Sequence, residues 1–371
     1  MEFTIQRDNL LKSLGHACGV VEKKTTLPIL SNILIEAKGT KIKITATDLD
    51  IIYSEEVPLL ELKKEGSTTT SATILYDIIK KLEPNSKIEF NLQSQNKLKI
   101  VSSKSKFNLL CIPSDSFPLS NEDINEKTFE ISSQKMLKLL HKTKISISND
   151  ETRHYLNGIY FHKAKSENKS FLSAVATDSH RLSLSNLEIE SEANFEPIIL
   201  PKKTIFQLIS LLEQSTNAVK ISNNKSKIKF EMGNGILISK VIDGRFPDYT
   251  KVIPRDNDKV LQIKLNEFKN SIERVISVSS DRKEGLKMNI SKDLLKLSVS
   301  NPNSGEGTEN VDAIFNSADM NISFNSRYLI DIASQIEGDS IVINLKDAGS
   351  PVLIKDLLDK NSFHVVMPMK I

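Results

Sequence analysis

At 371 residues the chain is longer than one hydrophobic core usually supports, so two or three domains are expected. Hydrophobic residues make up 39% and charged residues 26%, which is typical of a globular protein and excludes a disordered chain. The net charge of +3 is far below that of proteins that hold nucleic acid by charge alone. Any contact with nucleic acid should therefore be local and loose.

The cysteines and the apolar runs indicate the compartment. No apolar stretch approaches the roughly 20 residues that span a bilayer, and residues 1–8 lack the basic start and apolar centre of a signal peptide. Cys18 and Cys111 are the only cysteines, with no CxxC or Cys/His cluster nearby. This usage agrees with a reducing compartment and argues against structural zinc. We expect a cytoplasmic protein with no membrane contact.

The first part of the chain contains a pattern that recurs. A short strand at 3–5 precedes a helix whose apolar face carries Leu10, Leu14 and Cys18. Apolar runs at 27–35 and 41–44 predict strands that lead to the loop Thr47-Asp48. A second helix is predicted over 74–82, and strands with period-two alternation follow at 88–92 and 98–100. The phrase Phe117-Pro118 closes this copy.

Two further copies follow, with first strands at 129–131 and 261–263. The second copy has runs at 156–161 and 171–175, the loop 177–181, a helix over 203–213, alternating strands at 219–221 and 228–232, and Phe246-Pro247. The third has weaker strands between 285 and 301, a helix over 327–337, a strand at 341–345 and Met367-Pro368. A period of this length is that of a domain, not of a solenoid repeat. We predict an α+β fold of three repeated domains, at 1–127, 128–257 and 258–371, with helices packed on one face of antiparallel sheets.

Motifs for chemistry are missing from the sequence. It has no GxxxxGK[ST], GxGxxG, HExxH or GxSxG. Asp48, Asp50 and Asp178 could hold a nuclease metal, because hard cations prefer oxygen ligands. However, Asp48 and Asp178 occupy equivalent loops of two repeats, as turn-forming aspartates would. We therefore predict no catalytic residue, metal or cofactor, and keep a metal-dependent nuclease and a scaffold that never meets DNA as alternatives.

Five stretches together carry a resemblance. They are Thr26-Leu27-Pro28-Ile29-Leu30 with Thr47-Asp48, then 153–158 (RHYLNG), 177–182 (TDSHRL), 243–249 (DGRFPDY) and the tail 365–371 (VVMPMKI). On these residues the chain resembles, over its whole length, the bacterial sliding clamps, the beta subunits of DNA polymerase III. Ser179 stands where that family commonly has glycine and His154 where it has tyrosine, while Lys24, Lys202 and Lys370 stand where arginine is frequent.

The resemblance implies a function without chemistry. Family members are head-to-tail homodimers in which six clamp-type domains close a ring, with sheets outside and helices lining a hole around double-stranded DNA, read without sequence specificity. Such a processivity factor tethers the polymerase and is opened by an ATP-driven clamp loader. The implied partners are a second copy, duplex DNA, the DNA polymerase III alpha subunit, the clamp loader and other clamp-binding-motif proteins.

The resemblance also implies three sets of site residues. The residues expected to contact DNA are Lys24, Arg153, His154, Tyr155, Lys202 and Lys203. The expected partner-peptide cleft comprises Leu156, Thr177, His180, Arg181, Leu182, Pro247, Lys251, Val252, Tyr328, Val365, Val366, Met367, Pro368 and Met369. At the dimer interface, Phe107 and Leu109 should pack near Val278, and Lys104 and Lys106 should face Glu306 and Glu309.

Overall fold

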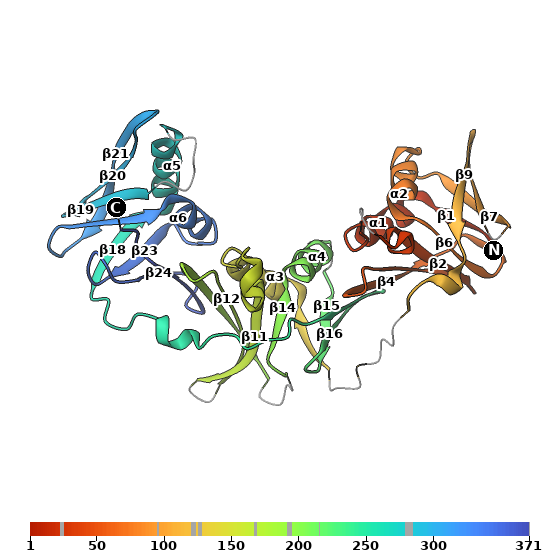
Figure 1. The fold of residues 1–371 in the computed structure, drawn as a ribbon, viewed down its shortest axis with the longest axis horizontal. Coiled ribbons are helices and arrows are strands. Elements are labelled where there is room, and N and C mark those ends of the chain that lie inside the picture. Colours follow the sequence, from red (N-terminus) through yellow and green to blue (C-terminus); the bar gives the residue numbers. More distant parts are fainter. Residues whose placement is uncertain are drawn as a thin grey trace. The chain divides into compact units, whose positions relative to one another are not determined.

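The computed structural model describes residues 1–22, 26–94, 96–119, 124, 128–166, 169–190, 195–214, 216–278 and 285–370. Figure 1 shows the helices and strands of the chain. The chain divides into two compact units. The first comprises Met1–Leu137, Glu192–Glu196 and Lys203–Val241, and the second Lys138–Ser191, Pro197–Lys202 and Ile242–Ile371. The division runs through the central repeat, so each unit contains one terminal repeat and part of the central one.

The first unit is built on one antiparallel sheet of thirteen described strands, in the order β10-β15-β16-β17-β4-β3-β2-β6-β9-β8-β7-β1-β5. Their bounds are β1 (Glu2–Gln6), β2 (Asn32–Lys38), β3 (Lys41–Thr47), β4 (Ile51–Pro58), β5 (Glu61–Lys64), β6 (Gly66–Ser71), β7 (Lys87–Ser94), β8 (Lys97–Ser102), β9 (Ser105–Ile112), β10 (Phe129–Ser132), β15 (Ala218–Asn223), β16 (Lys227–Met232) and β17 (Gly235–Lys240). The helices are α1 (Arg7–Cys18), α2 (Ala72–Lys81) and most of α4 (Lys202–Leu212), with the short 3₁₀ turns η1 (Pro28–Ser31) and η2 (Ser114–Ser116).

The second unit has a sheet of twelve described strands, in the order β14-β11-β12-β13-β25-β24-β23-β18-β21-β20-β19-β22. They are β11 (Gly158–Ser166), β12 (Lys169–Thr177), β13 (Arg181–Ile189), β14 (Ile198–Pro201), β18 (Lys259–Lys264), β19 (Gly285–Ser291), β20 (Leu294–Asn301), β21 (Gly305–Phe315), β22 (Met320–Asn325), β23 (Ser340–Leu345), β24 (Val352–Asp356) and β25 (Ser362–Val366). The helices are α5 (Leu265–Val275) and α6 (Ser326–Ala333), with η3 (Glu151–Leu156), η4 (Tyr249–Val252) and η5 (Ile276–Val278), while α3 (Ser133–Lys144) crosses the unit boundary.

In each unit, strands of two repeats pair directly. In the first unit β17 of the central repeat pairs antiparallel with β4 of the first repeat, with Leu237 opposite Tyr53. In the second unit β13 of the central repeat pairs with β25 of the third, with Ser183 opposite His364. We call the β4–β17 pairing the first joint and the β13–β25 pairing the second joint. Because a strand joins a strand at each, both sheets continue across a repeat boundary.

The helices form where apolar spacing and capping residues predict them. Helix α1 buries Leu10 and Leu14 on one face, and Ser71 and Asn325 cap α2 and α6 by accepting hydrogen bonds from backbone N–H groups. In the third repeat, residues packed against α5 and α6 form one continuous apolar core. None of the described helices combines the length and hydropathy of a membrane span.

Three sequence predictions differ from the structure in detail. The run at 27–35 begins as the 3₁₀ turn η1 and becomes strand only at Asn32, because Pro28 has no N–H to donate to a ladder. Leu156 likewise ends η3 and is not part of β11. The helix predicted over 327–337 ends at Ala333. Beyond it the amides of Gln335 and Ile336 bond three residues back, which tightens the chain into turns.

Candidate functional site

The loop between β12 and β13 is shaped by its own side chains. Oδ1 of Asp178 accepts hydrogen bonds from the backbone N–H groups of His180 and Arg181, at 2.9 Å each. The hydroxyl of Thr177 donates to the carbonyl of Arg181 at 2.7 Å. Ser179 has a φ of 77°, in the left-handed region that favours glycine. Asp48 bonds two amides of the corresponding loop in the first repeat in the same way. Both aspartates therefore form turns.

Arg181 connects this loop to helix α6. Its guanidinium donates to Asp178 Oδ2 at 3.2 Å and to Asp331 Oδ2 at 2.8 Å. The ring of Tyr328 lies under it, with Cζ 4.2 Å from the ring centroid. Burial, together with the carboxylate of Asp178, raises the pKa of the Tyr328 hydroxyl. Because two carboxylates and an aromatic face hold one guanidinium, Arg181 is fixed in position and rigidly joins β13 to α6.

A small apolar cluster lies beside this loop. Its buried members are Leu156, Val175, Leu182, Leu184, Ile199, Phe246, Leu353 and Val365, with Tyr155, Tyr160, Ile242, Tyr249 and Phe363 packed against them. The segment after β25 continues along the cluster, because the amide of Met367 donates to the carbonyl of His180 at 2.8 Å and that of Met369 to Ser323 at 2.7 Å. Residues 367–369 are thus bonded to two other elements and are not a frayed end.

Several residues predicted to belong to the cleft have exposed side chains. Val252 is 51% exposed, Met367 42% and Met369 38%, and the side chain of Lys251 is 80% exposed. Leu156, Leu182 and Val365, by contrast, are at most 3% exposed. The structure thus brings Leu156, Leu182 and Val365 into one cluster. Met367 is bonded to His180 beside this cluster, and Arg181 packs on Tyr328 at the adjoining loop.

The residues predicted to contact DNA are placed as follows. Arg153 donates to Asp150 at 2.8 Å and to the hydroxyl of Ser179 at 2.6 Å, and Tyr155 meets the exposed His154 edge-on. Thr152 and Arg153 together hold the pKa of Asp150 at about 2. Lys202 bonds the side chain of Asn149, and its amide bonds Asn157. In the other unit, Lys203 is paired with Asp48. Lys24 lies outside the described residues.

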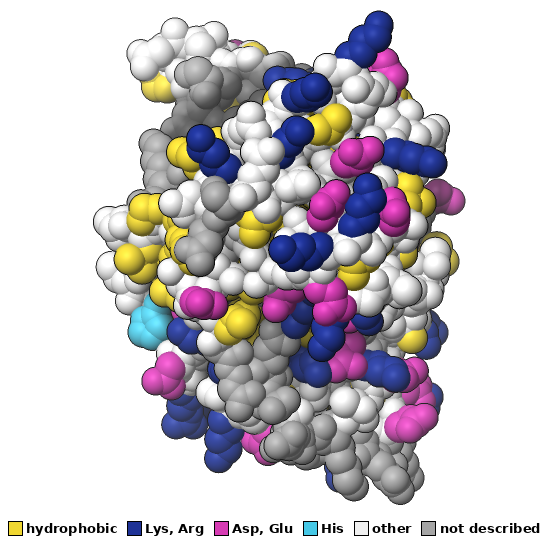
Figure 2. Space-filling model, turned by 90° about the vertical axis from the view of Figure 1, so that its right-hand side faces the viewer, with side chains coloured by type: hydrophobic (Ala, Val, Ile, Leu, Met, Phe, Trp, Pro, Cys, Tyr) yellow, Lys and Arg dark blue, Asp and Glu magenta, His cyan; other side chains and the backbone are white. Residues whose placement is uncertain are grey.

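The residues predicted at the dimer interface lie on or beside two strands with a free edge. Residues 105–110 of β9 pair with β8 on one side only, and β6 begins to pair at Cys111. Residues 305–312 of β21 pair only with β20, and β18 begins at Ala313. Within the described chain neither stretch has a strand on its other side. On the face that Figure 2 shows, basic and acidic side chains are interleaved and do not form a field of one sign.

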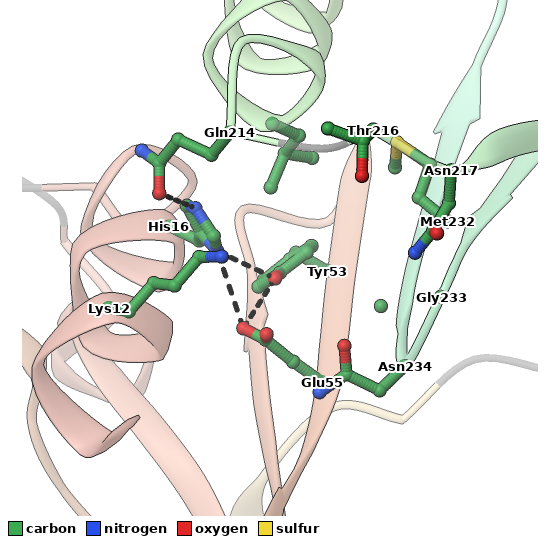
Figure 3. A pocket seen from close by; sticks show the side chains of 12 residues that line it. Lys12, His16, Tyr53, Glu55, Gln214, Thr216, Asn217, Met232, Gly233 and Asn234 are labelled. Atoms are coloured by element: carbon green, nitrogen blue, oxygen red, sulfur yellow. Dashed lines mark hydrogen bonds and ion pairs between the residues drawn. The ribbon is translucent and has the colours of Figure 1, made fainter. Parts of the chain in front are cut away.

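A polar cavity of about 140 Å³ lies at the first joint (Figure 3). His16 Nδ1 is 3.0 Å from the hydroxyl of Tyr53 and 3.3 Å from Glu55, and its Nε2 is 3.0 Å from Gln214. Tyr53 donates to Glu55 at 2.7 Å, and burial raises the pKa of its hydroxyl. These groups bond one another across two repeats, so we interpret the network as a joint and not as a reaction centre. Over the described residues, no three His, Cys, Asp or Glu side chains gather as metal ligands would.

Comparison with known proteins gives the family. Models of the N-terminal, central and C-terminal domains of the DNA polymerase III beta subunit match residues 1–121, 130–248 and 250–370. The beta sliding clamp of Caulobacter vibrioides is 36% identical over 373 residues, and that of Escherichia coli K12 is 31% identical over 371, each covering 100% of both chains. The chain belongs to the beta sliding clamp family.

Solved beta sliding clamps share the fold. The clamp from Bartonella birtlesii, solved bound to griselimycin, is 39% identical, with a TM-score of 0.96 and full coverage of both chains. That from Pseudomonas aeruginosa, also bound to griselimycin, is 32% identical, with a TM-score of 0.94 and full coverage. The chain is accordingly a three-domain, non-catalytic processivity clamp of DNA polymerase III, as the resemblance predicted.

The sequence predictions do not include one partner of Arg181 at the loop between β12 and β13. Asp331 holds Arg181 from helix α6, 150 residues further along the chain. Nothing in the spacing of the two residues connects them, because their contact depends on β25 pairing with β13. The only signal is that Asp331 lies three residues after Tyr328 and so shares a helix face with it.

Proposed function

We propose that two copies of this chain close head to tail into a ring that encloses duplex DNA, and that the cleft at the second joint tethers client proteins. In this proposal the repeats are the domains 1–127, 128–257 and 258–371, and the clamp works in the cytoplasm. The observation that carries it is the pair of free strand edges on β9 and β21. Strand β9 corresponds in its repeat to β17 and β25, and β21 corresponds to β4 and β13. Those four strands form the two joints within the chain.

The hairpins of the three repeats support this equivalence. Tyr53 of β4 lies opposite Ala46, and Ser183 of β13 lies opposite Ala176. In the third repeat the corresponding pair is Gly307 of β21 and Val299. Ala46, Ala176 and Val299 are all buried and each directly precedes the polar loop of its repeat. Gly307 is therefore the counterpart of the two residues that lie at the centre of the existing joints.

The other strand is matched in the same way. Leu237 lies opposite Phe230 in its hairpin and His364 opposite Ile354, and both then meet the neighbouring repeat. The counterpart in the first repeat is Phe107, opposite Ile100. A third joint with the same register puts Phe107 of one copy opposite Gly307 of the other. Because a heterologous contact repeated twice around a two-fold axis closes on itself, two such joints complete a ring.

This register accounts for much of the predicted interface. A Cβ built on Gly307 would be 3.3 Å from Cγ1 of Val278, so a side chain opposite that glycine can pack on Val278. Lys106 is then opposite Thr308, with Glu306 two residues along the same face. Glu309 is already bound by Arg274 at 3.0 Å, which lowers the pKa of its carboxyl. We therefore assign the cross-copy charge pair to Lys106 and Glu306.

The cleft proposal rests on the contrast between a buried apolar floor and an exposed apolar rim. Leu182 and Val365 are buried in one apolar cluster, and we assign them to the floor. Met367, Met369 and Val252 are exposed, and we assign them to the rim. Methionine side chains repack at little cost, so one groove can accept short peptides of differing shape. The polymerase alpha subunit, the clamp loader and other clamp-binding-motif proteins are the proposed clients.

Encirclement is tested by retention on DNA. Labelled protein is loaded onto a nicked circle by a clamp loader and the complex is isolated by gel filtration. Linearising the circle should release the protein, because topology and not charge retains it. The contacts of Arg153 and its neighbours with the DNA backbone are too weak to hold the protein on a linear duplex. Equal retention on circular and linear DNA would contradict the ring. Incubation of the same circle with protein and Mg²⁺ alone addresses the nuclease alternative, which requires cleavage.

A further inference from the structure

The segment that follows β17 is attached to the central repeat mainly through side chains. The amide of Ile242 donates to the carbonyl of Ile199 at 2.9 Å, and His154 Nε2 lies 3.2 Å from the carbonyl of Asp243. From Gly244 to Tyr249 the segment belongs to no strand of either sheet. Its position there depends on which side chains it buries.

Two contacts, an aromatic stack and a hydrogen bond, hold the segment on strand β11. Tyr160 and His162 are two residues apart on this strand and share one face of it. The ring of Tyr160 stacks on Phe246, with centroids 4.9 Å apart and planes at 9°, and on its other neighbour His162, at 4.9 Å and 28°. Phe246 is 7% exposed. The stack thus fixes the segment at one point, three residues before η4 begins.

The second contact is a hydrogen bond whose direction follows from its partners. His162 Nδ1 lies 3.2 Å from the carbonyl of Lys163, which can only accept, so the neutral ring carries its proton on Nδ1. Nε2 is then an acceptor, and the hydroxyl of Tyr249, 2.9 Å away, donates to it. Burial lowers the pKa of His162, which favours this neutral form. Tyr249 is the first residue of η4, so the bond holds the start of that turn.

These contacts bracket part of the proposed cleft. Pro247 lies between the two anchored residues, and Lys251 and Val252 follow Tyr249 in η4. We propose that Tyr160 and His162 are positioning residues of the client-peptide cleft: they touch no client themselves, but hold the segment 246–252 at the distance from the β25 tail that peptide binding requires. This inference rests on the proposed function of the cleft.

The most selective perturbation removes one hydrogen bond and keeps every ring. Tyr249→Phe leaves Nε2 of His162 without its donor, and His162→Phe removes the same bond from the other side. We expect either change to weaken binding of a labelled peptide from the C-terminal tail of the polymerase alpha subunit by about 3- to 10-fold, the effect of one ordinary hydrogen bond. The double variant should be no weaker than the weaker single variant, because both remove one interaction. His162→Gln, whose amide oxygen can accept from Tyr249, should bind within twofold of the unmodified protein.

Hydrogen exchange of the free protein tests the anchor without a client. Amides of residues 244–252 should exchange faster in Tyr249→Phe, whereas Lys165→Ala, an exposed change on the same strand, should alter neither exchange nor affinity. Unchanged exchange in Tyr249→Phe, or faster exchange with unchanged peptide affinity, overturns the positioning role while leaving the cleft intact. If the unmodified full-length protein does not bind the peptide, or binds it equally well after deletion of residues 367–371, the cleft itself is wrong and the positioning role falls with it.

Discussion

Replacing Phe107 with alanine tests the third joint where the register predicts its centre. Phe107 is only partly buried in its own chain, and its proposed neighbour across the interface is the space beside Gly307 and Val278. Burying one such side chain is worth about 1.5 to 3 kcal/mol, and a closed ring contains the joint twice, so the dimer should lose about 3 to 6 kcal/mol. At 1.4 kcal/mol per tenfold, the dimer Kd should rise by roughly two to four orders of magnitude.

Sedimentation velocity over a dilution series measures this Kd, and circular dichroism checks that the monomer is folded. Leu60→Ala is the matched control, because Leu60 is 51% exposed in the same repeat and lies outside β9. A folded Phe107→Ala protein whose Kd stays within threefold of the unmodified protein would refute the register. A charge exchange provides a second route: Lys106→Glu should weaken the dimer, and adding Glu306→Lys should restore it.

Four further outcomes are expected. Deleting residues 367–371 removes at least two apolar contacts from the cleft, so titration of a labelled client peptide should show binding weakened by about 100-fold or more, with the dimer retained in sedimentation. Arg153→Ala should lower the slope of log affinity against log salt by about 1 for a linear duplex, whatever its sequence; a sequence-dependent loss would contradict a phosphate contact. Burial holds the pKa of His364 at about 3, whereas the unfolded side chain titrates near 6.5. The stability that neutral, buried His364 contributes is therefore complete above pH 6.5 and is lost as the pH falls toward 3, by up to about 1.4 kcal/mol per pH unit. Urea unfolding of His364→Asn should show a shallower decline below pH 6.5 than the unmodified protein, and identical slopes would contradict this. The side chain of Lys142 is 4% exposed and lies among three carboxylates. Lys142→Ala should therefore lower the free energy of unfolding, measured with urea, by about 3 to 5 kcal/mol, whereas the exposed control Lys135→Ala should change it little.

The sequence predicted the repeats and their first helices because these depend on local spacing. The helix face of Leu10 and Leu14 and the alternation of Ile88, Phe90 and Leu92 are visible in short windows, and α1 and β7 form there. The polar loop at 177–181 was also predictable, since Asp178 bonds amides only two and three residues ahead. Local chemistry of this kind does not require knowledge of the tertiary structure.

Features that depend on the joints could not be predicted in this way. The partnership of Arg181 with Asp331 and the buried position of Lys142 exist only because the central and third repeats share a sheet. Lysine in a helix usually predicts a solvent-facing position, and Lys142 departs from it because Glu337, Asp356 and Asp359 approach from the third repeat. The division of the central repeat between two units has no signature in the sequence either, because period-two alternation does not identify the strand's partner.

The sequence separation of the paired strands has a consequence for folding. Leu237 must find Tyr53, and His364 must find Ser183, each across about half the chain, whereas most other ladders join neighbours in sequence. Contacts of such high sequence separation form late, because the loop must be closed before they stabilise anything. A folding intermediate should therefore have its hairpins formed while the edges of β4, β13, β17 and β25 are still unpaired. Those edges can then pair wrongly with another chain, so refolding yield should fall steeply with protein concentration even though the native sheets cover them.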